Sequence, residues 1–296
     1  MLCCGHLQVT SLAMSPVDDY FLSSSGGADR SVCLWSLASP APVARLDLPP
    51  DSLDPKVAYT HDGLLFGVMV TVHGQDSSFS SAPSTSNCIR LFDARSYDKG
   101  PFLQLIPTQS QLERALKIAQ PFLEPAPLQR LLAASRWESF CFSPDGTRAL
   151  VSTSSGMLIS LDAFDDNGDP IVFFTEERNT DRGDRTSAGG LQPCSSPSPS
   201  LGYCFTPDSK QVLAGTEDKT VRVYDSQTGR PLGALQPGGG KGGGAAGDQP
   251  SHVSAVTSVR CNPKYEVIAT SGFNTMLWLK SSLYKEEKET TSPEQS

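Results

Sequence analysis

Apolar and polar residues alternate in short runs along this chain, and one composite pattern of such runs recurs five times. Each occurrence begins with an alternating run that ends in a turn, and the five are VTSLAMSPVDD, VAYTHDG, SFCFSPDG, GYCFTPDS and SVRCNPKY. Alternation with a period of two predicts a half-buried β-strand, and Pro-Asp-Gly combinations reverse the chain. The pattern therefore predicts repeated strand–turn units.

Two further strand-like runs follow each turn. The second runs are YFLSSS, LLFGVMV, RALVSTS, QVLAGT and VIATSG, and the third are VCLWS, CIRLFD, LISLD, VRVYD and MLWL. A fourth run such as VARLDL or PLGALQ can complete a unit. Each repeat is thus predicted to form a small sheet of three or four short strands.

The turns mark the spacing of the repeats. They fall at Pro16, His61, Pro144, Pro207 and Pro263, at intervals of 45, 83, 63 and 56 residues. The first interval fits the repeat length of a four-stranded propeller blade, about 40–45 residues, and the longer ones imply inserts. We expect blades at 6–50, 51–106, 136–175, 201–236 and 252–280, inserts at 73–86, 108–135, 176–200 and 237–251, and a charged disordered tail at 281–296.

The inserts differ in character. Residues 73–86 are Ser-rich, and 176–200 and 237–251 have the composition of disordered segments. Within 108–135, helical spacing predicts a short surface helix that is interrupted at Pro121. The apolar positions of this helix are Leu112, Ala115, Leu116 and Ala119.

A small sheet of this kind cannot bury both of its faces alone, so such repeats stack around a shared axis. The predicted fold class is therefore all-β: a β-propeller with about five recognisable blades within residues 1–280, forming an incomplete or open ring with disordered inserts.

The first repeat carries polar residues that resemble the structural tetrad of WD repeats, namely His6, Ser25, Asp29 and Trp35. Asp29 lies six positions before Trp35, as Asp218 lies six before Tyr224. A protease triad uses similar residue types, but its serine needs an exposed elbow and an oxyanion hole. Because Ser25 falls within a predicted buried strand, a structural role is favoured and no catalytic residue is predicted. His252 precedes the last repeat much as His6 precedes the first, which also favours a structural role.

Composition narrows the classes of partner. The net charge of −8 argues against direct nucleic-acid binding through a basic face, and the apolar runs are much shorter than a membrane span. Cys141 and Cys204 occupy matching points in FCFSP and YCFTP, which favours reduced, buried, intracellular thiols. Cys3 and Cys4 lack a second pair at the spacing of a zinc site.

Two further motifs resemble ligand-binding loops but lack residues that such loops need. GGGKGGG lacks the Ser or Thr and the strand-to-helix context of a phosphate loop, so a flexible linker is favoured. An acidic turn hints at calcium but lacks the closing Glu of an EF-hand, so a solvated turn is favoured. The turn contains Asp162, Asp165, Asp166, Asn167, Gly168 and Asp169. No cofactor and no metal are predicted.

Several longer stretches resemble one family. SLAMSPVDDYFLSSS, RLFDARSYDKGPF, STSSGMLISLDAF, CFTPDSKQVLAGTEDKTVRVYDSQTG and NPKYEVIATSGFNTMLWL are similar to the WD-repeat subunit of COMPASS, the Set-type histone methyltransferase complex. The resemblance implies a nuclear, chromatin-associated, non-enzymatic scaffold that links the methyltransferase subunit to the phosphorylated tail of RNA polymerase II. A scaffold of a protein-phosphatase-one complex, or of mRNA 3′-end processing and transcription termination, is the alternative within the same family.

One loop is a candidate site for a protein partner. RSYDK follows a predicted third strand, and its residues Arg95, Tyr97, Asp98 and Lys99 are the candidates. Arg95 and Lys99 suit a phosphate or an acidic partner. A plain turn, stabilised by Asp98 and Gly100 before Pro101, is the favoured alternative.

The chain also departs from the family pattern. The family begins with about two more repeats than are seen before His6, so we expect either a fragment or an open arc of blades whose edge a partner covers.

Overall fold

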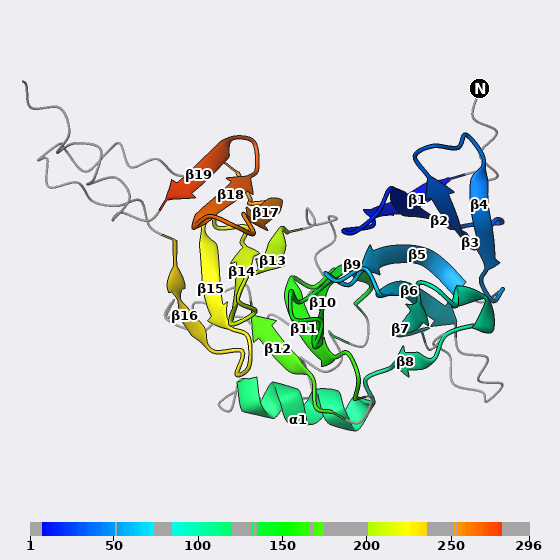
Figure 1. Ribbon diagram of the computed structural model, residues 1–296. Helices are drawn as coiled ribbons and strands as arrows, with labels where there is room; N and C mark the ends of the chain where they lie inside the picture. The colour runs from blue at the N-terminus through cyan, green and yellow to red at the C-terminus, as the bar shows by residue number, and fades with distance from the viewer. Residues whose placement is uncertain are drawn as a thin grey trace, which may run out of the picture. The chain divides into compact units, whose positions relative to one another are not determined.

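The computed structural model describes residues 8–50, 52–73, 85–119, 132, 135–165, 168–174, 201–235, 252 and 254–279 (Figure 1). The predicted inserts 176–200 and 237–251 and the predicted tail 281–296 lie outside these residues. The chain divides into two compact units, one with the sheets up to Phe174 and one with the sheets from residue 201 onward.

The first unit contains three antiparallel four-stranded sheets, blades 1 to 3. Blade 1 consists of β1 (Val9–Met14), β2 (Tyr20–Ser25), β3 (Ser31–Ser36) and β4 (Pro42–Asp47). Blade 2 consists of β5 (Ser52–Tyr59), β6 (Leu65–His73), β7 (Thr85–Asp93) and β8 (Leu103–Leu105). Blade 3 consists of β9 (Trp137–Phe142), β10 (Arg148–Thr153), β11 (Met157–Asp162) and β12 (Ile171–Phe174). In each blade the strands neighbour one another in chain order.

The second unit contains blades 4 and 5. Blade 4 consists of β13 (Tyr203–Phe205), β14 (Gln211–Gly215), β15 (Val221–Asp225) and β16 (Pro231–Ala234). Blade 5 has three strands in the part of the chain that the structure describes, β17 (Ser258–Cys261), β18 (Val267–Ser271) and β19 (Thr275–Leu279). The predicted all-β class with bladed antiparallel sheets is confirmed.

Three of the predicted turns share one set of hydrogen bonds between a hydroxyl and an aspartate two positions later. Thr60 Oγ1 donates to Asp62 Oδ1 at 2.6 Å, Ser143 Oγ to the Asp145 carboxylate at 2.5 Å, and Thr206 Oγ1 to the Asp208 carboxylate at 2.6 Å. These bonds lower the pKa of Asp62 and of Asp208. The Ser/Thr-x-Asp sequence therefore closes the turn between the first two strands of blades 2, 3 and 4.

The core lies between neighbouring blades. Leu22 and Val32 of blade 1 share an apolar cluster with Val57 and Phe66 of blade 2. Between blades 2 and 3 the approach is close at Gly67, where an added Cβ would lie 2.9 Å from the Phe140 ring. A residue without a side chain is therefore needed there for the two sheets to pack.

The predicted helix is confirmed as α1 (Gln109–Ala119). A reciprocal capping box opens it, because the Gln111 backbone N–H donates to Thr108 Oγ1 at 3.3 Å and the Thr108 N–H donates to Gln111 Oε1 at 2.7 Å. Ala115 and Leu116 are buried in the apolar cluster of blades 2 and 3. The first part of the insert 108–135 thus contributes to the core, since one face of its helix is apolar.

The predicted insert 73–86 needs a correction at both ends. His73 pairs with Thr85, so β6 and β7 continue into residues predicted to be a loop. Backbone pairing requires no apolar side chain, and the β-branched Val70, Thr71 and Val72 continue the strand to this point. Among the described residues, no helix combines the length and apolar character that crossing a bilayer would require.

Candidate functional site

The indole of Trp35 is buried in blade 1, with 5% of the side chain exposed. Its Nε1–H donates to Ser23 Oγ at 2.7 Å, and its ring stacks on Phe21 with centroids 5.9 Å apart. The strand register explains the partner, because Trp35 pairs with Phe21 and Ser23 lies two residues further along the same face of β2. The hydroxyl that accepts the hydrogen bond of the Trp35 indole is therefore that of Ser23, and not that of the predicted Ser25.

Of the other predicted members, Ser25 and Asp29 are among the described residues. Ser25 Oγ is buried without a hydrogen-bond partner among the described residues, and His6 lies outside them. Asp29 lies in the turn between β2 and β3, and its carboxylate forms an ion pair with Arg45 Nη2 of β4 at 2.6 Å. The Asp29 side chain is only 6% exposed. This ion pair connects the turn to the outer strand of the blade.

A hydrogen-bond chain with the predicted tetrad chemistry is present in blade 5. Trp278 Nε1–H donates to Thr270 Oγ1 at 2.7 Å, His252 Nε2 lies 2.7 Å from the same hydroxyl, and His252 Nδ1 lies 3.3 Å from Asn274 Oδ1. Because the hydroxyl accepts from the indole, its own proton is available for His252 Nε2, and Nδ1–H then faces the amide oxygen of Asn274.

In this set of hydrogen bonds, the hydroxyl proton of Thr270, a residue that is 1% exposed, is committed to the Nε2 atom of His252. The geometry of this set suits the fixing of strands β18 and β19 rather than attack on a substrate. The sequence singles out His252 alone. The signal for the others is register, since Thr270 stands relative to Trp278 as Ser23 stands relative to Trp35.

Blade 4 has a buried Tyr224 at the indole position and a carboxylate in the preceding turn. Burial acts to raise the pKa of Asp218, but hydrogen bonds from Thr216, Thr220 and Arg222 outweigh it and lower the pKa to about 2. Thr220 Oγ1 donates at 2.6 Å and Arg222 Nη2 at 3.0 Å. Asp218 is therefore ionised and fixed at neutral pH.

The candidate partner loop lies between β7 and β8 of blade 2. Its backbone forms a turn, because the Arg95 N–H donates to Asp93 Oδ1 at 2.7 Å and the Gly100 N–H donates to Tyr97 O at 3.2 Å. Gly100 has φ +86°, a conformation that favours glycine. Residues 97–99 form one 3₁₀ turn, η1 (Tyr97–Lys99), and the carboxylate that closes the loop belongs to Asp93, not to Asp98.

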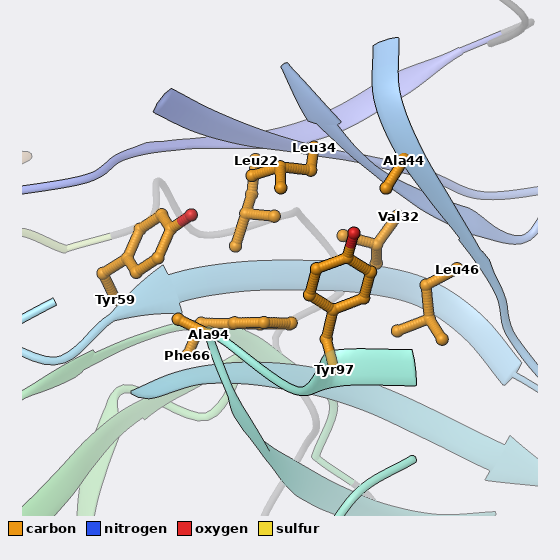
Figure 2. A pocket seen from close by; sticks show the side chains of 9 residues that line it. All are labelled: Leu22, Val32, Leu34, Ala44, Leu46, Tyr59, Phe66, Ala94 and Tyr97. Carbon is orange, nitrogen blue, oxygen red and sulfur yellow. The ribbon is translucent and has the colours of Figure 1, made fainter. Parts of the chain in front are cut away.

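Tyr97 anchors this loop against blade 1. Its ring and that of Tyr59 rise from the blade 2 side toward apolar side chains of β2, β3 and β4 (Figure 2). Together they line a pocket of about 20 Å³ between the two blades. The lining residues are Leu22, Val32, Leu34, Ala44, Leu46, Tyr59, Phe66, Ala94 and Tyr97. Burial, with a smaller contribution from Asp18, raises the pKa of Tyr59 to about 12, so the pocket remains uncharged.

The charged side chains of the loop face solvent. Arg95, Asp98 and Lys99 are exposed, and none forms an ion pair with another described residue. An anchored loop that presents a guanidinium and an ammonium group suits an anionic ligand group such as a phosphate. The backbone of this loop forms the turn that the sequence favours, and its role in partner binding stays a prediction.

The acidic turn of blade 3 serves the fold. Asp162 Oδ1 accepts the backbone N–H groups of Phe164 and Asp165 at 3.0 and 3.1 Å, and Asp169 pairs with Arg114 of α1 at 2.6 Å. Asp166 and Asn167 lie outside the described residues. Within the described ranges, no group of three His, Cys, Asp or Glu residues is arranged to hold a metal ion.

Comparison with known proteins identifies the repeats. The WD domain, G-beta repeat, matches residues 2–36 and 200–225. WD repeat-containing protein 82 of Drosophila melanogaster is 29% identical over 279 residues, which are 94% of this chain and 65% of that protein. The COMPASS component SWD2 of Saccharomyces cerevisiae is 26% identical over 270 residues, 90% of this chain and 63% of that protein.

A third relative, the Set1 complex component swd2 of Schizosaccharomyces pombe, is 25% identical over 74% of this chain and 48% of its own length. The chain thus spans about half to two thirds of the length of these curated relatives. A chain in the crystal structure of the mitotic checkpoint complex shares the fold, with a TM-score of 0.53 and 13% identity over 90% of this chain and 61% of its own. The chain therefore carries WD repeats in the all-β fold of a propeller, and it is similar to a COMPASS component and to a Set1 complex component.

Proposed function

We propose that this chain is a non-catalytic interaction scaffold of a nuclear histone methyltransferase complex of the COMPASS type. One observation carries the proposal: relatives that include a COMPASS component match this chain over 90% or more of its length. The role proposed for the chain is to hold the methyltransferase subunit close to transcribing RNA polymerase II.

The geometry supports a binding role of this kind. Apolar clusters fix blades 1, 2 and 3 to one another within the first unit, so loops at the ends of these blades are presented on a packed frame. In blade 5, hydrogen bonds of Thr270 with Trp278 and His252 fix the strands. Binding through preformed loops loses little conformational entropy, which favours recognition of several partners by different loops.

The loop at Arg95–Lys99 is the proposed contact for the phosphorylated polymerase tail. Tyr97 is held in the pocket between blades 1 and 2, so Arg95 and Lys99 project from a fixed base. A phosphoserine carries nearly two negative charges at neutral pH, and both cations are suited to it.

The first test is purification of the epitope-tagged chain from nuclear extract. We expect the methyltransferase subunit and phosphorylated polymerase to co-purify. Recovery of neither would overturn the proposal. Recovery of protein phosphatase one, or of cleavage and polyadenylation factors, in place of the methyltransferase would favour the alternative scaffold role.

The second test measures binding of a polymerase-tail peptide by fluorescence anisotropy. The phosphopeptide is expected to bind more tightly than its unphosphorylated form, and R95A/K99A is expected to weaken binding about tenfold, which corresponds to about 1.4 kcal/mol. R230A/K264A is the matched control, because it removes an exposed Arg and an exposed Lys from blades 4 and 5. Equal losses in both double variants would indicate non-specific charge attraction and contradict the assignment of the loop.

A further inference from the structure

Two cysteine side chains meet between blades 4 and 5. Cys204 lies on β13 and Cys261 ends β17, and their sulfur atoms are 3.6 Å apart. Both strands belong to the second unit, so this contact lies within one compact body. Neither residue forms a disulfide in the structure.

The repeat itself explains why these two positions meet. Cys204 lies two residues before its turn residue Thr206, whereas Cys261 lies one residue before Asn262. Successive strand residues point to opposite faces, so these two positions face opposite neighbouring blades. A small residue at the first position therefore meets a residue at the second position on the following blade.

The same pairing of positions occurs at the other blade contacts. Ala58 of blade 2 belongs to one apolar cluster with Phe142 of blade 3, and Ala13 of blade 1 belongs to one with Tyr59 of blade 2. Only at blades 4 and 5, among these three described contacts, are both positions cysteine.

The surroundings separate the roles of the two thiols. Cys204 is 9% exposed within an apolar cluster that includes Leu213, Val256 and Val259, whereas Cys261 is partly exposed. The hydrogen bond with the Cys204 thiol lowers the pKa of Cys261, against the opposing effects of burial and of Asp208. Cys261 is accordingly the thiol that reacts first, and Cys204 is the one that follows.

We propose that Cys204 and Cys261 form a redox-active dithiol that a peroxide converts into a disulfide between blades 4 and 5. In the first step, the Cys261 thiolate attacks a peroxide oxygen, the O–O bond breaks, and hydroxide leaves and is protonated to water, which gives a sulfenic acid. In the second step, Cys204, after losing its proton to solvent, attacks that sulfur, the S–S bond forms, and the S–O bond breaks to release a second water.

The net reaction oxidises two thiols to one disulfide and reduces one hydrogen peroxide to two waters. The sulfur atoms need to approach from 3.6 Å to about 2.0 Å, a movement that two side chains can share by rotation. The product would connect two sheets through cysteines that are 57 residues apart in sequence, and it would stabilise the second unit.

The test uses the full chain with C3S, C4S and C194S, because these three cysteines lie outside the described residues. After treatment with stoichiometric hydrogen peroxide, non-reducing peptide mapping is expected to show one cross-linked peptide pair that contains Cys204 and Cys261. Dithiothreitol is expected to reverse the cross-link. The oxidised chain is expected to melt several degrees higher than the reduced chain.

The matched control is C141S, because Cys141 holds in blade 3 the position that Cys204 holds in blade 4. C141S is expected to leave the cross-link unchanged, whereas C204S is expected to abolish it and to leave Cys261 as a sulfenic or sulfinic acid. Peroxide treatment that gives only over-oxidised Cys261 in the chain that retains Cys204, or a cross-link between other cysteines, would overturn the proposal. Peptide mapping of that chain decides the matter even if C204S fails to fold.

Discussion

Blades 1 and 5 both place an indole beside a strand hydroxyl in the same register, and the other polar groups described around this bond differ between the two blades. In blade 1, Trp35 donates to Ser23 and the nearby turn is held by the Asp29–Arg45 ion pair. In blade 5, Trp278 donates to Thr270, which also contacts His252, and the turn supplies the neutral Asn274.

The lengths of the connections account for part of this difference. The connection between the second and third strands covers residues 26–30 in blade 1 and 272–274 in blade 5. The longer turn places its carboxylate beside Arg45 of the fourth strand, whereas the described part of blade 5 has three strands and its turn contacts a histidine. The indole–hydroxyl bond is thus a feature that both blades share, and the turn groups described near it differ.

Removal of the two indoles is expected to give the largest loss in the free energy of unfolding. The two losses should show which blade depends more on its indole. W35A empties a space where the side chain is 5% exposed, so we expect a loss of about 3–5 kcal/mol in the free energy of unfolding. W278A, at a partly exposed position, is expected to cost less than half as much. Urea unfolding followed by circular dichroism measures both, and hydrogen exchange assigns each loss to its blade.

The control for these variants is Y265A, which removes an aromatic side chain that is 69% exposed and should change stability little. Equal losses for W35A and W278A would contradict the difference in burial between the two blades.

The hydroxyls provide the second comparison. T270V keeps the shape of a side chain that is 1% exposed but leaves both Trp278 Nε1–H and His252 Nε2 without their partner. Each unsatisfied buried group costs about 1–3 kcal/mol, and because Trp278 is partly exposed we expect a total near the low end, about 2–3 kcal/mol. S23A removes one indole acceptor and is expected to cost about 1–2 kcal/mol. T270S keeps the hydroxyl and should retain most of the stability. A smaller loss for T270V than for S23A would show that the hydrogen bond with His252 adds nothing to the stability.

These residues also show what the sequence could and could not predict. The five strand–turn patterns, the helix at 109–119 and the fold class follow from periodicity and turn chemistry, which are local properties. The choice between Ser23 and Ser25 is not local, because three consecutive serines look alike until the pairing of Phe21 with Trp35 is known.

The same limit applies to the candidate sites. The exposed charges of the RSYDK loop are readable from sequence, but its anchor is not, because Tyr97 reaches a pocket lined largely by blade 1. Asn274 lies four positions before Trp278 rather than six, so a search at fixed spacing misses it. The contact between Cys204 and Cys261 likewise requires the stacking of two blades.

The turn of blade 4 carries a carboxylate, whereas the turn of blade 5 carries an amide. The stability that the blade 4 turn contributes should therefore depend on pH. Asp218 has a pKa of about 2 in the fold, below its ordinary value of 3.8, so its contribution is present above about pH 4 and is lost as the pH falls toward 2. Because the side chain is 50% exposed, we expect D218N to cost only about 1 kcal/mol at pH 7.

This cost should disappear near pH 2, and urea unfolding at several pH values measures it. N274D introduces a carboxylate at the amide position of blade 5 and is the companion variant, while E217Q is the exposed neighbouring control. A D218N difference that stays constant from pH 7 to pH 2 would contradict the role of the charge.

The smallest expected effect concerns the ion pair that distinguishes blade 1. R45A removes a guanidinium that is 42% exposed from the buried Asp29 carboxylate and from the exposed Asp47. Exposed pairs contribute about 0.2–1 kcal/mol, and we expect a loss of about 0.5–1 kcal/mol that shrinks as salt is raised to 1 M. R45K should recover only part of it, because an ammonium group cannot bridge two carboxylates in the forked geometry of arginine. A loss that does not depend on salt would instead mean that the stem of Arg45 stabilises the blade by packing, and the ion pair would then no longer explain how the longer turn is held.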